Sequence, residues 1–456
     1  MQNYLIRNAR IVNEGTILET DLMISGGRIE KIGSVSTDTN VREIDARGKY
    51  LLPGVIDDQV HFREPGLTHK ATIYSESRAA VAGGTTSFME MPNTIPPALT
   101  QEELEKKYDI ASTTSLANYS FFMGTSNDNA DEVLKTNDRK KDVCGIKIFM
   151  GASTGSMLVD NHLTLNRIFR DAEVLIATHC EDERVIKKNL EELRLSNTVL
   201  EPWHHPVIRD AEACFESSLT AIQLAQKYGT RLHILHISTA KELQLFSNMM
   251  PLKEKRITTE VCVHHLHFTA DDYANLGYKI KCNPAIKASE NKAGLWEALL
   301  DDRLDIIATD HAPHLLSEKN PPYEKAHAGL PLVQHSLVLM LHYYKMGKIS
   351  LEKIVSKMSH AVADCFQIVD RGYIREGYYA DLVIVDPKGT TPVNKDTILY
   401  KCGWSPLESA GPGGPGAGGF SFPAAITHTF VNGHLVYGNN QFNESQKGMR
   451  LQFNRQ

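Results

Sequence analysis

Eight short strand-like segments, separated by helix-like or loop segments, constrain the fold of this chain more than any other feature. They lie at residues 55–57, 86–91, 116–123, 145–150, 174–179, 232–236, 257–263 and 305–309. Strands that alternate with helices predict a parallel sheet. Eight repeats predict a closed, TIM-like (β/α)8 barrel, in which a functional site would lie at the carboxyl ends of the strands.

The two ends of the chain predict a second, smaller unit that is rich in strands. Strand-like segments cover residues 4–12, 21–24 and 28–32, and a turn at 25–27 separates the last two. Residues 380–385 are typical of a buried strand, and 427–437 form a predicted hairpin around Asn432-Gly433. We therefore predict an α/β fold in which residues 1–52 and 373–456 build a β-sandwich domain and residues 53–372 form the barrel. The alternative is two separate edge hairpins packed on the barrel.

Composition narrows the class of protein further. The 456 residues suffice for one large barrel with an appendage. A net charge of −6 implies no basic face, so nucleic acid is not an expected partner. The seven cysteines lack CxxC spacing, which favours reduced thiols in a cytoplasmic protein. No signal-like start and no run of about 18 apolar residues occur, so we expect no membrane association. The Gly/Pro-rich segment 409–419 predicts a mobile loop.

Metal-ligand residue types follow four of the predicted strands. His61, His179, His236 and Asp310 stand at or just after the ends of the first, fifth, sixth and eighth strands. One such histidine alone is more often structural, but four donors on a shared rim indicate a metal site. Nitrogen and oxygen donors of this kind suit zinc. The pair at 264–265 after the seventh strand is interpreted as packing or as outer support.

Two cationic residues add to this pattern. Lys147 lies within an apolar strand, where burial should lower its pKa and leave a neutral amine that can react with carbon dioxide to form a carbamate. The alternative is an ion-paired lysine at the barrel rim. Arg63 follows His61 closely and can bind a carboxylate through two hydrogen bonds. The alternative for Arg63 is a surface ion pair with Glu64 or Asp58.

Several motifs together resemble those of the dihydroorotases of the amidohydrolase superfamily. They are LPGVID at 52–57, HFREPG at 61–66, MPNT at 91–94, NP at 283–284 and ATDHAPH at 308–314, and KCGWSP at 401–406 is similar to a further part of the pattern. The resemblance covers nearly the whole chain. Hydantoinases and allantoinases share the barrel and the metals, but Arg63 favours a dihydroorotase.

The resemblance implies a site with two zinc ions. His61, Asp310 and a Lys147 carboxylated by carbon dioxide would hold the alpha ion, and Lys147, His179 and His236 the beta ion. The ions would activate water and polarise a ring amide, and Asp310 would transfer the proton. The implied reaction is the reversible cyclisation of N-carbamoyl-L-aspartate to L-dihydroorotate in de novo pyrimidine biosynthesis.

The resemblance also implies how the small-molecule substrate is held. Arg63, Asn93 and His314 would bind the substrate carboxylate, Asn283 would contact the pyrimidine ring, and Gly329 would present backbone groups to it. The segment 151–155 would form a mobile loop over the ligand. Family habit makes a homodimer plausible.

One position departs from the family pattern. Gln59 stands where a histidine is expected, and a neutral amide oxygen is a weaker zinc ligand than imidazole. Gln59 could ligate through its oxygen, leave the alpha site partly empty, or make the enzyme poor or inactive. Because the other five ligands remain, we expect metal binding to be retained.

Two other functions stay open from the sequence. One is a hydantoinase-like cyclic amidase, although Arg63 and Asn93 have no evident purpose for a neutral ring. The other is a catalytically silent homologue that scaffolds an aspartate carbamoyltransferase. Gln59 favours the silent homologue, and the five intact ligands disfavour it.

Overall fold

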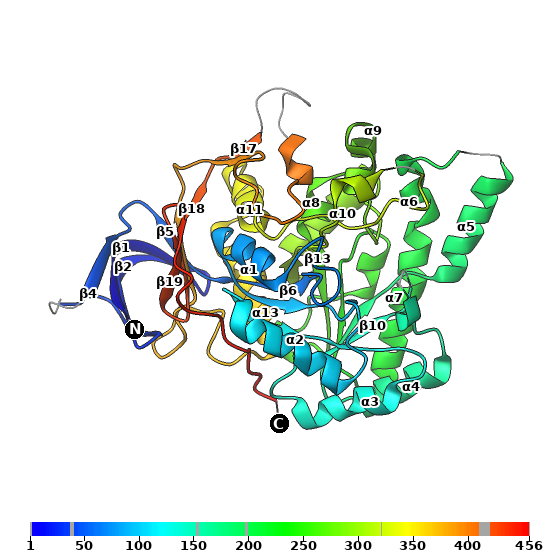
Figure 1. The fold of residues 1–456 in the computed structure, drawn as a ribbon, viewed down its shortest axis with the longest axis horizontal. Coiled ribbons are helices and arrows are strands. Elements are labelled where there is room, and N and C mark those ends of the chain that lie inside the picture. The colour runs from blue at the N-terminus through cyan, green and yellow to red at the C-terminus, as the bar shows by residue number, and fades with distance from the viewer. Residues whose placement is uncertain are drawn as a thin grey trace.

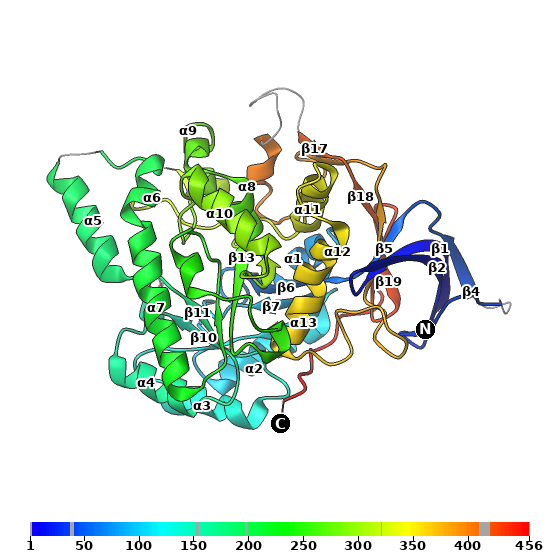
Figure 2. The ribbon, with the colours of Figure 1, turned by 180° about the vertical axis from the view of Figure 1, so that it is seen from behind.

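The computed structural model describes residues 2–36, 41–151, 155–196, 199–320, 322–409 and 420–455. Figure 1 shows an α/β body with a smaller group of strands beside it. Blue strands from the start of the chain and red strands from its end lie together in that group, whereas the helices surround the body (Figures 1 and 2).

Eight parallel strands form the body, and each corresponds to one predicted segment. They are β6 (Val55–Val60), β7 (Thr85–Glu90), β8 (Asn118–Phe121), β10 (Ile146–Phe149), β11 (Ile176–His179), β12 (Leu232–Ile234), β13 (Ile257–Cys262) and β14 (Ile306–Ala308). The short β9 (Met123–Gly124) continues from β8 and pairs with β10. A parallel bridge between Val60 and His311 joins the last strand to the first. The predicted (β/α)8 barrel is confirmed.

Helices follow or separate these strands along the chain. They are α1 (Ile73–Ala82), α2 (Gln101–Thr114), α3 (Ala130–Leu134), α4 (His162–Asp171), α5 (Glu183–Leu195), α6 (His205–Ile208), α7 (Ala211–Tyr228), α8 (Val263–His267), α9 (Tyr273–Leu276), α10 (Ser289–Leu300), α11 (Ser336–Lys345), α12 (Leu351–Val355) and α13 (Ala361–Phe366). A π-helical turn, Ser356–His360, joins α12 to α13.

Local sequence explains where these elements begin and end. Thr72 caps the N-terminus of helix α1, and its side chain accepts a hydrogen bond from the Ser75 N–H in a capping box. Asp210 caps the N-terminus of helix α7, and Gly229, with a left-handed φ of 68°, caps its C-terminus. Nearly every residue of the barrel strands is buried, because helices cover the outer face and side chains fill the interior.

The strands from the two chain ends form one hydrogen-bonded sheet. Its order is β20-β19-β18-β15-β5-β1-β2-β3, and β4 also pairs with β1. The bounds are β1 Asn3–Asn13, β2 Thr16–Ser25, β3 Arg28–Ile32, β4 Val41–Asp45, β5 Tyr50–Pro53, β15 Leu382–Asp386, β18 Ala425–Val431, β19 His434–Gly438 and β20 Gln441–Phe442; β16 (Thr391–Val393) pairs separately with β17 (Phe420–Phe422). The described strands therefore form a single unit rather than two separate hairpins.

The predicted turns and the shared core account for this joint sheet. Asn432 and Gly433 both have positive φ angles, 52° and 73°, as the expected two-residue hairpin turn between β18 and β19 requires. Strands β5 and β15 pair antiparallel and so join the two ends of the chain. Tyr4 and Phe430 pack edge to face with ring centroids 5.2 Å apart. The α/β fold class with a β domain built from both termini is confirmed, and the residue boundaries stay a prediction.

Two segments near the end of the chain return to the barrel. Leu451 donates its N–H to the Tyr119 carbonyl, and Gly448 donates to the Ser115 carbonyl, so residues 448–455 run along the barrel. Residues 401–404 instead pack beside the loop that follows β14, where Trp404 donates to the His314 carbonyl.

Three observations bear on the remaining predictions. Within the described ranges, no helix combines the length and the apolar composition needed to cross a lipid bilayer. All seven cysteines fall inside those ranges and are unpaired. The Gly/Pro-rich segment lies outside the described residues apart from Ser409, as do the three central residues of the predicted loop 151–155.

Candidate functional site

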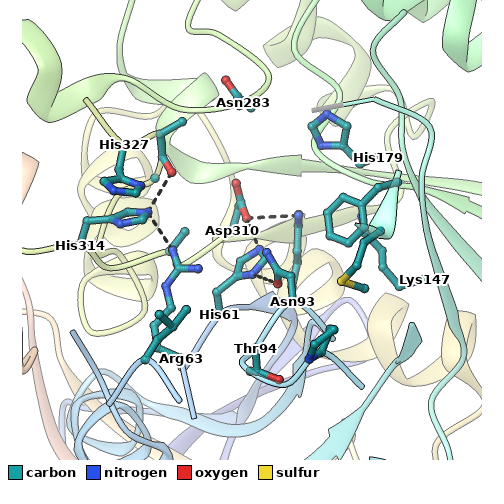
Figure 3. A pocket seen from close by; sticks show the side chains of 18 of the residues that line it. His61, Arg63, Asn93, Thr94, Lys147, His179, Asn283, Asp310, His314 and His327 are labelled. Carbon is teal, nitrogen blue, oxygen red and sulfur yellow. Dashed lines mark hydrogen bonds and ion pairs between the residues drawn. The ribbon is translucent and has the colours of Figure 1, made fainter. Parts of the chain in front are cut away.

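One cavity of about 520 Å³ is lined by every residue that the sequence predicts for the site. These residues are Gln59, His61, Arg63, Asn93, Lys147, His179, His236, Asn283, Asp310, His314 and Gly329. Most of them lie at or just beyond the carboxyl ends of barrel strands, because the parallel strands all end on the same rim. Figure 3 shows Lys147 and His179 on one side of the cavity and Arg63, His314 and His327 on the other, with Asp310 and His61 between them.

Three of these residues adopt strained backbone conformations. Arg63, His236 and Asp310 have positive φ angles of 67°, 40° and 48°. Such a conformation costs a residue other than glycine about 1–3 kcal/mol and persists only where the surroundings hold it. The strain therefore marks positions at which the fold fixes the direction of a side chain.

Two imidazoles face each other at the ends of β11 and β12. His179 Nδ1 lies 3.1 Å from His236 Nε2, and His179 Nε2 lies 2.9 Å from Glu181 Oε2. Because a carboxylate only accepts, His179 Nε2 carries the proton, and the lone pair of Nδ1 accepts from His236 Nε2. Burial lowers the pKa of both histidines, which favours the neutral, ligand-competent form.

A buried ion pair supports this arrangement from behind. Arg209 donates to the same Glu181 oxygen at 2.6 Å. Burial alone would raise the pKa of Glu181, but Arg209 and His179 outweigh it and lower the pKa to about 2. Glu181 is therefore a permanent carboxylate that holds one tautomer of His179.

Lys147 in β10 is a buried amine that lines the cavity. Its side chain is 1% exposed, and its Nζ lies 4.6 Å from the centre of the Phe149 ring. Among the described residues, no hydrogen bond to this Nζ is formed. Burial lowers the pKa of Lys147 to about 7, against the opposing pull of Asp310 and Glu260. A substantial fraction of neutral amine is therefore present near neutral pH.

Asp310 connects the first and last strands of the barrel. Its Oδ1 lies 3.1 Å from His61 Nε2 and accepts from Gln59 Nε2 at 3.2 Å. His61 Nδ1 donates to Asn93 Oδ1 at 2.7 Å, which directs Nε2 at the Asp310 carboxylate oxygen, so these two ligand-type atoms lie side by side where a cation could be shared. The Gln59 oxygen points the other way, toward Cys262 Sγ at 3.7 Å. Gln59 thus offers its N–H to Asp310, and ligation through oxygen would require its amide to turn.

The opposite side of the cavity is cationic. Arg63 donates from Nε to the Pro313 carbonyl at 3.1 Å, and its Nη2 lies 3.0 Å from His314 Nε2. Burial lowers the pKa of Arg63 only to about 10, so the guanidinium stays charged at neutral pH. Lys70 approaches His314 Nδ1 at 3.1 Å and pairs with Glu318 at 2.9 Å. A ligand carboxylate would meet concentrated positive charge here.

Residues 327–329 line a further part of the cavity. Gly329 has a φ of 139°, and a Cβ at this position would lie 2.5 Å from the Ala312 carbonyl oxygen. Lys319 holds this segment by donating to the carbonyls of Lys281, His327 and Gly329. On another wall, His205 contacts Asn283 Oδ1 at 3.0 Å. The backbone of Gly329 and the side-chain amide of Asn283 are therefore both part of the cavity lining.

The donor set at this cavity fits zinc. Two neutral imidazoles converge, His236 Nδ1 has no hydrogen-bond partner among the described residues, and burial lowers the pKa of the Lys147 amine. Nitrogen and oxygen donors of this kind are typical of catalytic zinc sites. The described residues hold three further clusters of ligand-type side chains: Cys262 with His264 and His265, His314 with Glu318 and His327, and Asp58 with His233 and Glu260. His264 and His265 lie in α8 and are buried away from the cavity lining.

Sequence reasoning missed several residues of this site. Lys70, His327, Glu181 and Lys319 contact lining residues or line the cavity themselves. Lys70 comes soon after the motif at 61–66, which was the only available indication. The others belong to loops and short helices whose course no apolar pattern fixes.

Comparisons with known proteins agree with this geometry. A family model for dihydro-orotase-like proteins matches residues 48–242, and one for the amidohydrolase family matches residues 211–436. The dihydroorotase of Methanosarcina mazei is 34% identical over 90% of this chain and 91% of its own length, and that of Halobacterium salinarum is 32% identical over 89% and 92%. The solved L-hydantoinase (dihydropyrimidinase) of Arthrobacter aurescens superposes with a TM-score of 0.88 at 25% identity, over 97% of this chain and 98% of its own.

Proposed function

The chain belongs to the dihydroorotase family of cyclic amide hydrolases, and we propose that its site holds two zinc ions and interconverts L-dihydroorotate and N-carbamoyl-L-aspartate. The observation that carries this proposal is the division of the cavity. Neutral metal-type donors line one side, and a buried, charged Arg63 lies on the other. A cyclic amide with a ring carboxylate would fit between them.

The metal ligands follow from the donor set. His61, Asp310 and a carboxylated Lys147 would hold the alpha ion, and Lys147, His179 and His236 the beta ion. Burial lowers the pKa of the Lys147 amine, which supports carbamate formation with carbon dioxide. The carbamate would replace a buried cation by an anion that can bind metal. When bound, zinc ions lower the pKa of water and polarise a carbonyl oxygen.

Asp310 is proposed as the group that moves the proton. Its carboxylate lies beside His61 and faces the cavity in a conformation fixed by the backbone. In hydrolysis it would take a proton from the attacking water and give it to the departing ring nitrogen, as a general base and then a general acid. In the cyclising direction the same carboxylate would run these transfers in reverse.

Substrate recognition is proposed for the opposite wall. Arg63 would bind the ring carboxylate, with Asn93 and His314 beside it, while Asn283 and the Gly329 backbone would contact the ring amides. The Asn93 side-chain oxygen accepts a hydrogen bond from His61, so the N–H groups of its amide would be left for the substrate.

The experiment that tests this function compares three substrates on one purified sample. Hydrolysis of dihydroorotate should proceed, while hydantoin and dihydrouracil, which lack the carboxylate, should be turned over at least 100-fold more slowly. Faster turnover of hydantoin than of dihydroorotate would replace the proposal by a hydantoinase-like amidase. No turnover of any of the three, together with co-purification of an aspartate carbamoyltransferase, would favour the silent scaffold.

Replacement of Arg63 by Met is expected to raise KM for dihydroorotate with a smaller change in kcat. Removing one partner of a buried, hydrogen-bonded charge pair costs about 2–5 kcal/mol, which corresponds to roughly a 30- to 5,000-fold rise in KM. Steady-state kinetics of the Arg63→Met protein measure this rise in KM. Arg63→Lys is the matched control, because it keeps the charge without the two-pronged geometry and should lose less. An unchanged KM in Arg63→Met would refute carboxylate recognition by Arg63.

Replacement of Gln59 by His is expected to increase zinc affinity at the alpha position. Imidazole is the better zinc ligand, and a direct ligand should matter at least as much as the outer contacts that change affinity about 10–100-fold. Zinc titration and turnover measure the effect, and Gln59→Asn, which keeps an amide, should show no gain. A Gln59→His protein that bound no more zinc and turned over no faster would mean that position 59 does not limit the site.

Assembly and location complete the proposal. We propose a homodimer in the cytoplasm, with aspartate carbamoyltransferase as the partner to test first. Light scattering of the purified chain, alone and mixed with that transferase, measures both associations. A chain that stays monomeric and does not bind the transferase would contradict both proposed associations.

A further inference from the structure

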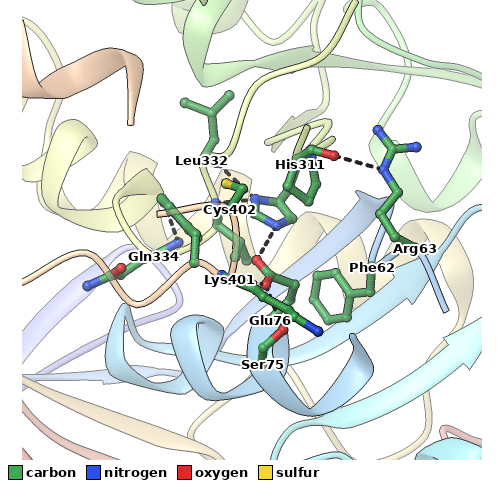
Figure 4. A network of polar contacts seen from close by, with 12 residues as sticks. Phe62, Arg63, Ser75, Glu76, His311, Leu332, Gln334, Lys401 and Cys402 are labelled. Carbon is green, nitrogen blue, oxygen red and sulfur yellow. Dashed lines mark hydrogen bonds and ion pairs between the residues drawn. The ribbon is translucent and has the colours of Figure 1, made fainter. Parts of the chain in front are cut away.

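A fully buried carboxylate behind the cavity connects three parts of the chain. Glu76 of α1 accepts from His311 Nε2 at 2.8 Å through one oxygen. Its other oxygen accepts from the Lys401 N–H at 3.1 Å and from Ser75 Oγ at 2.8 Å. Figure 4 shows Glu76 between the helix, the loop after β14 and the segment around Lys401. Glu76 and His311 are both 0% exposed, and neither lines the cavity.

The hydrogen bonds of His311 permit only one tautomer. Its Nδ1 accepts from the N–H groups of Leu332 at 2.9 Å and Val333 at 3.2 Å. That nitrogen therefore carries a lone pair, and the proton must lie on Nε2, which faces Glu76. Both ring nitrogens are satisfied, so the ring orientation is set from two sides.

The backbone of His311 carries this fixed orientation into the site. Its N–H donates to Thr309 Oγ1 at 3.0 Å, and its carbonyl accepts from the His61 N–H at 2.7 Å. Asp310, the preceding residue, holds its positive φ of 48° between these contacts. Because a strained conformation persists only when its surroundings over-determine it, the contacts of His311 help to hold the Asp310 backbone, in addition to the contacts of the Asp310 carboxylate with Gln59 and His61.

The segment 401–404 holds the same loop at a second point. Besides the Lys401 contact with Glu76, Trp404 Nε1 donates to the His314 carbonyl at 2.8 Å. The KCGWSP motif at 401–406 supplies no residue to the cavity lining, and these contacts show that it holds the loop after β14 instead.

We propose that Glu76 is a positioning residue for the reaction. It acts through His311 to orient the Asp310 carboxylate. Glu76 touches neither the substrate space nor a metal ligand. The inference rests on the proposed role of Asp310 in proton transfer.

Replacement of Glu76 by Gln should disturb this arrangement without changing the side-chain size. The carboxylate accepts from three donors on two oxygens, whereas an amide offers one oxygen and one NH2 group. If the amide oxygen faces His311, the NH2 group opposes the Lys401 N–H. If it faces Lys401, the NH2 group opposes the His311 Nε2–H, and His311 cannot switch tautomer because Nδ1 is engaged.

The experiment measures kcat, KM and bound zinc for Glu76→Gln, with melting temperature as the check on folding. We expect kcat to fall about 10- to 100-fold, the usual effect of losing a support behind a functional group, while KM changes less than threefold and zinc is retained. The matched control is Glu242→Gln, a buried carboxylate that accepts from Ser218 and Thr239 and does not line the cavity. It should lower the melting temperature and leave kcat unchanged.

A double-mutant cycle tests whether Glu76 acts through His311. The Glu76→Gln/His311→Gln protein should be about as slow as the slower single variant, since both break the same contact. Should Glu76→Gln fail to fold, His311→Gln tests that contact from the other side. Additive losses, or a normal kcat in a folded Glu76→Gln protein, would overturn the inference. If Asp310→Asn keeps turnover, the proposed proton transfer fails instead, whatever the Glu76 variants show.

Discussion

The Asp310→Asn variant is expected to lose turnover of dihydroorotate by about 10²–10⁴-fold, the contribution of a positioned proton-transfer group, while the fold stays intact. The substitution is nearly isosteric, and the amide oxygen can still accept from Gln59 Nε2, the contact that measures 3.2 Å for the carboxylate. A neutral amide cannot take a proton from water at neutral pH, and it is a weaker metal ligand than a carboxylate.

Steady-state rates, circular dichroism and melting temperature measure the Asp310→Asn result. The matched control is Asp305→Asn, near the opposite end of the same strand. Asp305 is also buried, and it pairs with Lys255 at 2.6 Å, far from the carboxyl-end rim. This variant should lose stability and keep kcat. Near-normal turnover in a folded Asp310→Asn protein would refute the role of Asp310.

The Lys147→Met variant is expected to bind less than half of the zinc and to show no measurable turnover, with or without added bicarbonate. Without the amine no carbamate forms, and both proposed ions lose a shared ligand. The metal-free variant should be at least as stable as the metal-free parent, because it no longer buries an amine whose pKa burial lowers to about 7.

A second buried lysine supplies the contrast for this prediction. Lys107 pairs with Glu90 at 2.6 Å, and both side chains are 1% exposed. Lys107→Met breaks a buried pair and should cost about 3–5 kcal/mol of unfolding free energy. Zinc analysis and denaturation of both metal-free proteins measure the two effects. A Lys147→Met protein that kept its zinc and its turnover would exclude the carbamate.

Much of the fold was predictable because it depends on local patterns. Barrel strands are buried on both faces, and each of the eight predicted segments overlaps one of them. Asn432-Gly433 specified its hairpin because both residues tolerate positive φ. The return of residues 448–455 to the barrel could not be predicted, since its contacts are long-range: backbone hydrogen bonds to Ser115 and Tyr119, and Arg455 donating to the Cys144 carbonyl.

The candidate site was predictable where strand ends supply it. His179 and Lys147 lie in strands, and parallel strands bring their carboxyl ends together. Glu181, Lys70 and Lys319 act through loops whose conformation arises from tertiary packing, so sequence spacing gave no reason to choose them. The direction of the Gln59 amide depends on Asp310 and Cys262, neighbours that only the folded barrel brings close.

Zinc content and dihydroorotate hydrolysis, measured on the same purified sample, test the proposed two-zinc site most directly. We expect about two zinc ions per chain together with turnover, the pairing that a two-metal hydrolase requires. One ion or none, with no turnover even after zinc and bicarbonate are added, would contradict the proposal. It would mean that Gln59 has disabled the site, and the silent scaffold would then be the better description of this chain.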